Sequence, residues 1–438
     1  MRRGLIVILR NLSRTGLRIP AILLHAIGRQ LAASVTLAAV LLITASVGAE
    51  QLRLTMDEAV ARAVQTHPDV ASARRAVDIA EAGLQRGKAW LPANPYLSGG
   101  AGTTTQQGVG NNYGFYISQE FEIAGQRSKR IGVATQDMAK AASELTGAQQ
   151  TLAAAVKTAF VQGLVGIDRV PLAQQGLDVT TELSTQLGRI RNPSDAQRID
   201  LNNAQIQDSV ARRDVTAMQQ ARDNALTTIR RLVGLPLDQG ISLAGTPILQ
   251  VRPLPGEAEL VARALRQRPD LVAQQRALDK ADAQIALVER EGIPNITLSG
   301  NLSRFEGATL AGGDLGVHLP VFQRKTSEIN EAVAERDRER STMENLKRTI
   351  EQEAIEARRS CDATALDLQT LTDVVVPKHE ENLHLEQRLH NSGDAAYSDV
   401  LSMRLELLAA RREYLDAVQA YNEALIELER IVGGNLEP

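Results

Sequence analysis

The chain has 438 residues, which is too long for a single ordinary hydrophobic core. Its length therefore indicates several domains or a repeated, elongated structure. Aromatic residues make up only 3% of the chain, which favours long helices over compact globules. Removing the six arginines of residues 1–49 from the net charge of −3 leaves −9 for residues 50–438, which argues against nucleic acid as a partner.

Residues 1–49 have the pattern of a secretory signal peptide. They are rich in arginine, contain no acidic residue, and continue into an apolar stretch from Leu31 to Ala45. Small residues at Val47 and Ala49 predict cleavage after Ala49. The alternative is a transmembrane anchor, but about 15 apolar residues fall short of the ~20 that span a bilayer. Because no later stretch is long enough either, we expect any membrane-spanning part to be a closed β-barrel.

The rest of the chain consists of two internal repeats. Residues 58–82 and 259–283 are identical at 12 of 25 positions, at an offset of 201. Matching segments continue to the ends of both halves, where Arg231-Leu232-Val233-Gly234 recurs as Arg430-Ile431-Val432-Gly433. We therefore predict a first repeat over 50–238, a Pro/Gly-rich linker over 239–256 and a second repeat over 257–438.

Each repeat is predicted to begin with two helices. Thr55-Met56-Asp57-Glu58 is a capping box, in which the threonine and glutamate side chains each accept from the other's backbone N–H. Pro68 and Pro269 suit the first turn of the second helix, where a missing N–H has no cost.

Strand pairs follow these helices, predicted over about 95–106 and 112–123, and over about 295–303 and 313–322. The second strand alternates, with Tyr113, Phe115 and Ile117 on one face. Gly-rich segments at 107–111 and 304–313 are predicted as the hairpin loops. Eight of the chain's twelve aromatic residues lie in or beside these strands: Trp90, Tyr96, Tyr113, Phe115, Tyr116, Phe121, Phe305 and Phe322. Such a concentration is typical of the interfacial girdles of membrane barrels, although strands also prefer aromatic residues in general.

A very long helix follows each hairpin, over about 125–188 and 326–392. At 1.5 Å per residue the first extends roughly 95 Å. Apolar and small residues recur at 3/4 spacing, as coiled-coil packing requires; the second copy has Ile350, Ala354, Ala357, Cys361, Thr364, Leu368, Leu371 and Val375. Cys361, the only cysteine, is expected to be a buried structural thiol.

Four strands cannot close a membrane barrel, which needs at least about eight. Open edges would leave backbone groups unpaired in lipid, at a cost of several kcal/mol each. The strand count therefore predicts oligomerisation, with eight strands from two copies or twelve from three.

This order of elements resembles the TolC-like outer-membrane efflux proteins over nearly all of residues 52–435. The resemblance is carried by Thr66-His67-Pro68-Asp69, Trp90-Leu91-Pro92, Ile117-Ser118-Gln119-Glu120 and His318-Leu319-Pro320-Val321-Phe322. The segment Glu122-Ile123-Ala124-Gly125-Gln126-Arg127 and the turn Gly188-Arg189-Ile190 are most similar to the heavy-metal branch typified by CzcC.

The resemblance implies a mainly α homotrimer: a twelve-stranded β-barrel in outer-membrane lipid, four strands per chain, continuous with a long periplasmic α-helical barrel. It implies a passive exit duct for an inner-membrane pump, of the RND type, joined through a periplasmic adaptor. The periplasmic tips correspond to the turns at Gly188 to Asp195 and at Gly393 to Asp399. Asp399 matches the aspartate that lines the family's closed pore entrance, while Ala395 and Ser402 replace residues that some relatives use at the gate.

No catalytic, cofactor or tight metal site is expected. His379 and His384 are five residues apart, not the four of a helical metal pair, and neither a phosphate loop nor a nucleophile elbow occurs. The rival interpretation is an exported coiled-coil scaffold or adhesion protein, which leaves the two strand hairpins unexplained. The transported substrate, metal or other small molecule, is not encoded in these patterns.

Overall fold

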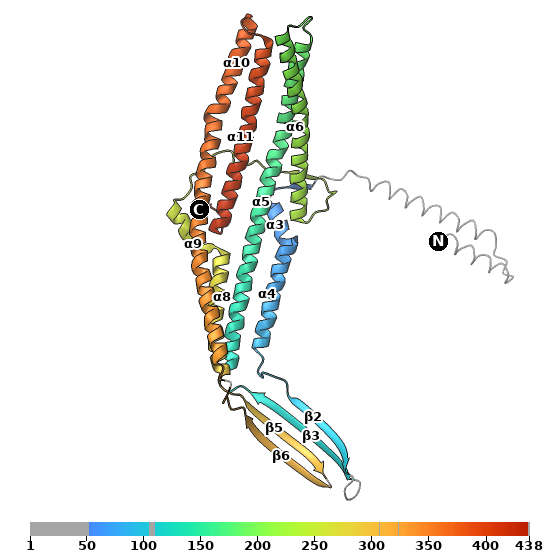
Figure 1. The fold of residues 1–438 in the computed structure, drawn as a ribbon, viewed down its shortest axis with the longest axis vertical. Coiled ribbons are helices and arrows are strands. Elements are labelled where there is room, and N and C mark those ends of the chain that lie inside the picture. Colours follow the sequence, from blue (N-terminus) through green and yellow to red (C-terminus); the bar gives the residue numbers. More distant parts are fainter. Residues whose placement is uncertain (1–51, 105–109, 306, 323, 437–438) are drawn as a thin grey trace, which may run out of the picture. The chain divides into compact units, whose positions relative to one another are not determined.

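A computed structural model of the protein describes residues 52–104, 110–305, 307–322 and 324–436. The predicted signal peptide and its cleavage site lie outside the described residues. The two repeats follow the same plan of two helices, two strands and two long helices (Figure 1).

The first repeat consists of α3 (Met56–Thr66), α4 (Pro68–Gly87), β2 (Tyr96–Thr104), β3 (Gly110–Phe121), α5 (Gln126–Gly188) and α6 (Asp195–Val233). The second consists of α7 (Glu257–Gln267), α8 (Pro269–Glu291), β5 (Ile296–Phe305), β6 (Ala308–Val317), α9 (Thr326–Thr370), the π-helical turn η2 (Leu371–Val375), α10 (Val376–Ser392) and α11 (Tyr397–Val432). The predicted long helices are confirmed, the second as the continuous run α9–η2–α10.

Two short strands, β1 (Leu52–Leu54) and β4 (Ile241–Leu243), pair with each other. β4 lies inside the predicted linker, where no strand was expected. Residues 52–53 and 238–242 group as a small unit distinct from the remaining described chain.

The capping residues predicted at the helix ends occupy the expected positions. The Thr55 N–H donates to Glu58 Oε2 at 2.9 Å and the Glu58 N–H donates to Thr55 Oγ1 at 3.3 Å, closing the capping box. Pro68 and Pro269 occupy the first turns of α4 and α8. Each repeat ends on a glycine with positive φ, Gly234 at 72° and Gly433 at 85°, a conformation that favours glycine at a helix C-terminus.

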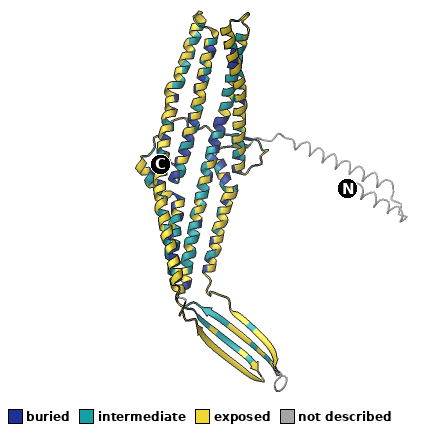
Figure 2. Ribbon diagram, in the orientation of Figure 1, coloured by how far each residue is buried: buried dark blue, intermediate teal, exposed yellow. Residues whose placement is uncertain are grey.

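The main core lies where α5, α7, α9 and α11 meet. It contains Val161 and Val165 of α5, Leu260 of α7, Ile350 of α9 and Tyr421 of α11, all at most 1% exposed. Six of the eight predicted seam residues are buried, namely Ile350, Ala354, Ala357, Cys361, Leu368 and Leu371, whereas Thr364 and Val375 are half-buried. Figure 2 shows that buried residues recur along the long helices. Burial is therefore concentrated in the helices, while the described residues of β2, β3, β5 and β6 stay exposed or half-buried.

The four longer strands form one antiparallel sheet in the order β2-β3-β5-β6. The two hairpins are joined along β3 and β5, where Ile117 lies opposite Gly300. Strands β2 and β6 have no partner on their outer sides among the described residues.

The predicted strand bounds hold to within two residues for β2, β3 and β5 but are wrong for β6. That strand covers Ala308–Val317, not 313–322, and the segment 304–313 is mostly strand and not a loop. Only positions 306 and 307 separate β5 from β6, and Gly307 has a φ of 86°. The glycines at 312 and 313 look like loop residues, but they pair opposite Asn301 and Gly300 inside the ladder.

Candidate functional site

The two tips of the long helices are built by different caps. In the first tip, α5 ends at Gly188 and α6 begins at Asp195; the Ser194 side chain accepts from the Gln197 N–H, and the Gln197 side chain accepts from the Ser194 N–H. In the second tip, Gly393 has a φ of 87° and ends α10. The chain reverses in both turns, so each long helix pair is an antiparallel hairpin whose tip carries predicted site residues.

Asp399 is exposed and lies in the first turn of α11. Its carboxylate accepts from the Ala396 N–H at 3.2 Å, so it satisfies a backbone donor that the helix leaves open. An aspartate that caps a helix through its side chain often occupies the N-cap position itself. That position belongs to Ala396, and Asp399 acts from three residues further on.

The structure brings the two tips together through residues that the sequence interpretation missed. The Tyr397 hydroxyl donates to Glu182 Oε1 at 2.7 Å, which joins α11 to α5. This hydrogen bond to Glu182 raises the pKa of Tyr397 above its ordinary value, because it favours the protonated phenol. Arg404 lies 4.0 Å from the same carboxylate. Tyr397 and Arg404 are seven residues apart, about two helical turns, and that spacing was the available signal.

His390 completes the second tip. Its Nδ1 lies 3.0 Å from the Ala395 carbonyl, which can only accept, so Nδ1 carries the proton. Its ring packs against Tyr397 with centroids 5.3 Å apart. The turn thereby holds the tyrosine that reaches across to Glu182.

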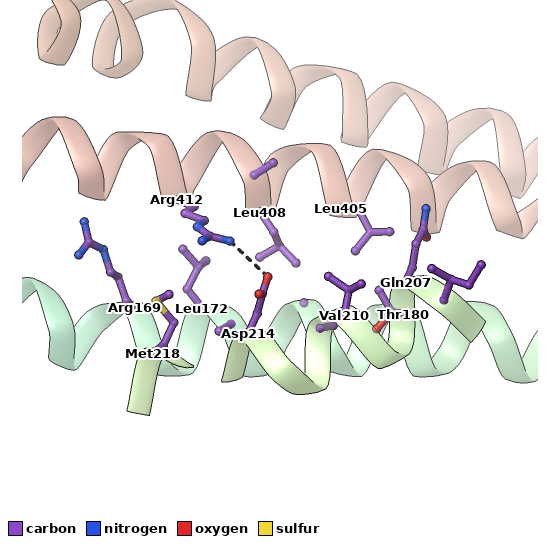
Figure 3. Close-up of a pocket in the computed structure, with 15 residues that line it drawn as sticks. Arg169, Leu172, Thr180, Gln207, Val210, Asp214, Met218, Leu405, Leu408 and Arg412 are labelled. Atoms are coloured by element: carbon purple, nitrogen blue, oxygen red, sulfur yellow. Dashed lines mark hydrogen bonds and ion pairs between the residues drawn. The ribbon is translucent and has the colours of Figure 1, made fainter. Parts of the chain in front are cut away.

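Further along, the contact between the two hairpins is partly polar and partly apolar. A polar cavity of about 590 Å³ lies between α5 and the α10–α11 hairpin, lined by Asp178, Glu182, Glu380, His384, Arg404 and Arg411 among others. An apolar groove of about 350 Å³ lies over α5, between α6 and α11 (Figure 3). Val210 and Leu408 point into this groove, and the Arg412–Asp214 ion pair bridges it at 3.4 Å. The hairpins also share a small apolar core near the tips, formed by Val179 and Leu183 of α5, Ala204 of α6 and Leu401 of α11.

The sheet has two chemically different faces, set by its register. One face carries Leu97, Phe115, Leu302, Leu298 and Leu315, aligned in neighbouring rows of the four strands. Leu97 and Leu315 are about 70% exposed, at 69% and 70%. The other face carries mainly glycines, serines and threonines together with Glu120 and Asp314, and it also holds Tyr96, Tyr116 and Leu310. A sheet with one exposed apolar face and one more polar face is suited to separating lipid from water.

The described residues contain no group of three or more His, Cys, Asp or Glu side chains that could hold a metal ion. His379 pairs with Glu406 at 3.9 Å, and His384 lines the polar cavity apart from it. Cys361 is buried, as predicted, and burial raises its pKa to about 11, which makes the thiol unreactive at neutral pH.

Among the described helices, α5 alone is long and apolar enough to cross a membrane by length and composition. Half of its most apolar window is buried against other helices. Its apolar residues, such as Phe160 and Val165, belong to the protein core, so helix packing explains its hydropathy.

Comparison with known proteins agrees with this architecture. Residues 59–235 and 260–434 each match the outer membrane efflux protein family, one match per repeat. The cobalt-zinc-cadmium resistance protein CzcC of Cupriavidus metallidurans is 23% identical over 383 residues, covering 87% of this chain and 90% of CzcC. The cation efflux system protein CusC of Escherichia coli K12 is 26% identical over 242 residues, about half of each chain.

Solved structures share the fold. The open state of the Neisseria gonorrhoeae MtrE outer membrane channel aligns with a TM-score of 0.74 at 19% identity, covering 87% of this chain and 89% of MtrE. A CusC crystal structure aligns with a TM-score of 0.71 at 16% identity, covering 87% and 92% of the two chains. The predicted TolC-like resemblance is confirmed: the chain belongs to the outer membrane efflux protein family and is an outer-membrane efflux channel component.

Proposed function

We propose that the chain is the exit duct of a heavy-metal-cation efflux system. In this proposal three copies close a twelve-stranded barrel in outer-membrane lipid, and their long helices form the periplasmic duct. A periplasmic adaptor joins the duct to an inner-membrane pump of the RND type. Transport through the duct is passive, and the pump supplies the energy.

The sheet is the observation that carries this proposal. Its apolar face is exposed in the single chain, and both outer edges, β2 and β6, are unpaired among the described residues. In lipid each unpaired backbone group costs several kcal/mol, so the edges must pair with other copies. Pairing β6 of one copy with β2 of the next satisfies both edges and repeats until the ring closes.

Two observations support cations as the cargo. The similarity to CzcC extends over most of both chains. In addition, the charged residues on the polar face of the described strands are Glu120 and Asp314, both acidic. Acidic side chains that line a pore favour cations over anions.

The duct is tested in two steps. Native mass spectrometry of the full chain in detergent should give three copies, and a stable monomer would contradict the assembly. In planar bilayers the purified protein should conduct without nucleotide and should hydrolyse no ATP.

The cargo is tested in cells. Deleting the gene should lower tolerance to cobalt, zinc or cadmium ions, and the intact gene should restore it. Unchanged metal tolerance combined with sensitivity to organic drugs would reject the metal assignment and leave the duct assignment standing.

Export is part of the same proposal. A signal peptide over residues 1–49 would give a mature chain that begins at Glu50. N-terminal sequencing of protein purified from outer membranes tests this, and a mature chain that retains Leu31–Ala45 would reject it.

A further inference from the structure

The polar face of the sheet carries two tyrosines. Tyr96 of β2 lies opposite Ser118, and Tyr116 of β3 lies opposite Ser98. Residues directly opposite each other in a ladder point to the same face of the sheet, and the row of Ser118 continues across the strands to Asp314. The two rings also contact each other edge to face, with centroids 6.4 Å apart. Both tyrosines therefore lie on the polar face.

The residues around this pair are small. In the rows of the two tyrosines and the next row toward the strand ends, the polar face holds mainly glycine, serine and asparagine. The other large apolar side chains of this face in the described strands are Leu310 and Phe305, both nearer the β5–β6 turn. Tyr96 and Tyr116 are 60% and 37% exposed, so their rings project from a face that is otherwise low around them.

An interfacial girdle does not account for this pair. Girdle residues of a membrane barrel face lipid, as Tyr113 and Phe115 do on the apolar face. A cross-strand aromatic pair stabilises a hairpin by about 0.2–1 kcal/mol, but it does so on either face of the sheet. Hairpin stability therefore does not explain why Tyr96 and Tyr116 project on the side of the small residues.

We propose that Tyr96 and Tyr116 form an aromatic belt inside the barrel, with six rings in a trimer, and that this belt limits the width of the solutes that pass. The inference rests on the proposed twelve-stranded barrel, in which the polar face lines the water-filled lumen. Phe305 is the last residue of β5 and lies at the rim of the barrel, whereas the belt lies further inside.

The width of the belt follows from the strand count. Twelve strands about 4.8 Å apart and tilted by about 40° give a backbone diameter of roughly 24 Å. Tyrosine rings that reach roughly 6 Å inward from opposite sides leave an opening of about 9 Å once their van der Waals radii are subtracted. A divalent ion with oxygen ligands at about 2.1 Å and waters about 1.4 Å in radius is roughly 7 Å wide. The belt therefore passes hydrated metal ions and excludes wider compact solutes.

The charges beside the belt favour cations. Asp314 lies in the row of Tyr96, and Glu120 lies in the next row toward the helices. Glu120 is held in place by Asn295, whose side-chain amide donates to Glu120 Oε1 at 2.8 Å. Carboxylates in a pore attract cations, and the faces of tyrosine rings do so as well. The belt thus matches the proposed cargo in both width and charge.

Cysteine labelling from outside intact cells tests the belt. In a Cys361→Ala background, Asn112→Cys and Glu120→Cys each place a thiol four residues from Tyr116, about 13 Å along β3 on either side. Both native residues are half-buried. A slim, membrane-impermeant maleimide should react with both cysteines. A maleimide linked to α-cyclodextrin, which is wider than the belt, should react with Asn112→Cys and not with Glu120→Cys.

Changing the tyrosines should move this width limit. Combining Tyr96→Ser with Tyr116→Ser widens the opening to about 16 Å, because serine reaches only about 2.5 Å from the backbone. The cyclodextrin label should then react with Glu120→Cys. Phenylalanine at both positions keeps the rings and should keep the exclusion. Tyr113→Ser removes the same side chain from the apolar face of the same strand and should also keep it.

The outcomes separate the belt from the barrel on which it rests. Reaction of the cyclodextrin label with Glu120→Cys while both tyrosines are present overturns the belt and leaves the duct intact. Continued exclusion after both serine substitutions also overturns the belt, because another part of the lumen then limits the width. If the slim maleimide fails to label either cysteine, or if native mass spectrometry of the variants shows no trimer, the barrel assignment fails as well.

Discussion

Removing the Tyr397 hydroxyl tests whether the link between the two tips holds the channel entrance closed. In Tyr397→Phe the ring stays packed near His390, while the hydrogen bond to Glu182 at 2.7 Å is lost. Hydrogen bonds to charged groups contribute about 1.5–3 kcal/mol. Tyr397 and the Glu182 side chain are 36% and 38% exposed, and solvent screening reduces the contribution to about 1 kcal/mol.

Three copies multiply the effect. If each copy of a trimer contributes one such link to the closed entrance, the variant loses about 3 kcal/mol, which shifts the ratio of closed to open channels by about two orders of magnitude. Single-channel recording in planar bilayers should therefore show Tyr397→Phe open for a much larger fraction of the time than wild type. Tyr414→Phe, on the same helix and away from the tip, is the matched control.

The pKa of Tyr397 sets the pH range of the experiment. The pKa is raised above 10.0, so the Tyr397 phenol keeps the proton that it donates at pH 7 and pH 9, and loses it only as the pH rises through the raised pKa. Wild type should gate identically at pH 7 and pH 9. An open fraction in Tyr397→Phe equal to that of Tyr414→Phe would refute the reasoning, because it would mean that the link does not hold the entrance.

Three further predictions concern the tip, the sheet and the first hairpin. We predict that Asp399 of the three chains forms a ring at the entrance. The Asp399→Asn variant keeps the acceptor for the Ala396 N–H, so its channel conductance should no longer be blocked by multivalent cations while its thermal stability is unchanged. Unchanged block of the conductance would reject the ring. Leu315→Arg on the apolar face should make the free energy of assembly in the membrane less favourable by about 2–4 kcal/mol, whereas Asp314→Arg on the polar face should assemble normally. Equal yields of the two variants from outer-membrane fractions would contradict the assignment of the faces. The hydrogen bond from Thr181 lowers the pKa of Asp208 below 3.8. This contact between α5 and α6 should therefore stabilise the fold at pH values above 3.8 and weaken as the pH falls through the lowered pKa. Equal acid unfolding of wild type and Asp208→Asn, followed by circular dichroism, would show that the contact does not contribute to stability.

Periodicity predicted the helical part of the fold because its determinants are local. The capping box at Thr55, the prolines at 68 and 269 and the 3/4 spacing of the α9 seam each act within a few residues along the chain. The same residues therefore determine both the pattern in the sequence and the structure.

The β6 strand was misplaced because its determinants are not local. Its glycines at 312 and 313 have no strand propensity, and they are held in the ladder by pairing with β5. The segment from His318 to Phe322 has the stronger alternating pattern but no partner strand among the described residues.

The contact between the two tips could not be predicted for the same reason, because it is not local in the sequence. Gly393 and Asp399 were identified from the turn itself, whereas Glu182 reaches Tyr397 from 215 residues away. A contact at that separation depends on how two helical hairpins pack, which a single sequence does not encode in any local pattern.

The distribution of burial in one copy supports the proposed assembly of several copies. The main core lies among α5, α7, α9 and α11, and contacts within one chain complete it. Within the part of the chain that the structure describes, the sheet has its apolar face and both edges free, and α10 has no buried residue. A chain with this distribution can fold its helices alone, but its sheet carries two exposed edges that would pair with any available strand. We therefore expect the sheet to become stable only as the copies meet in lipid, so that closure of the ring and insertion into the membrane occur as one step.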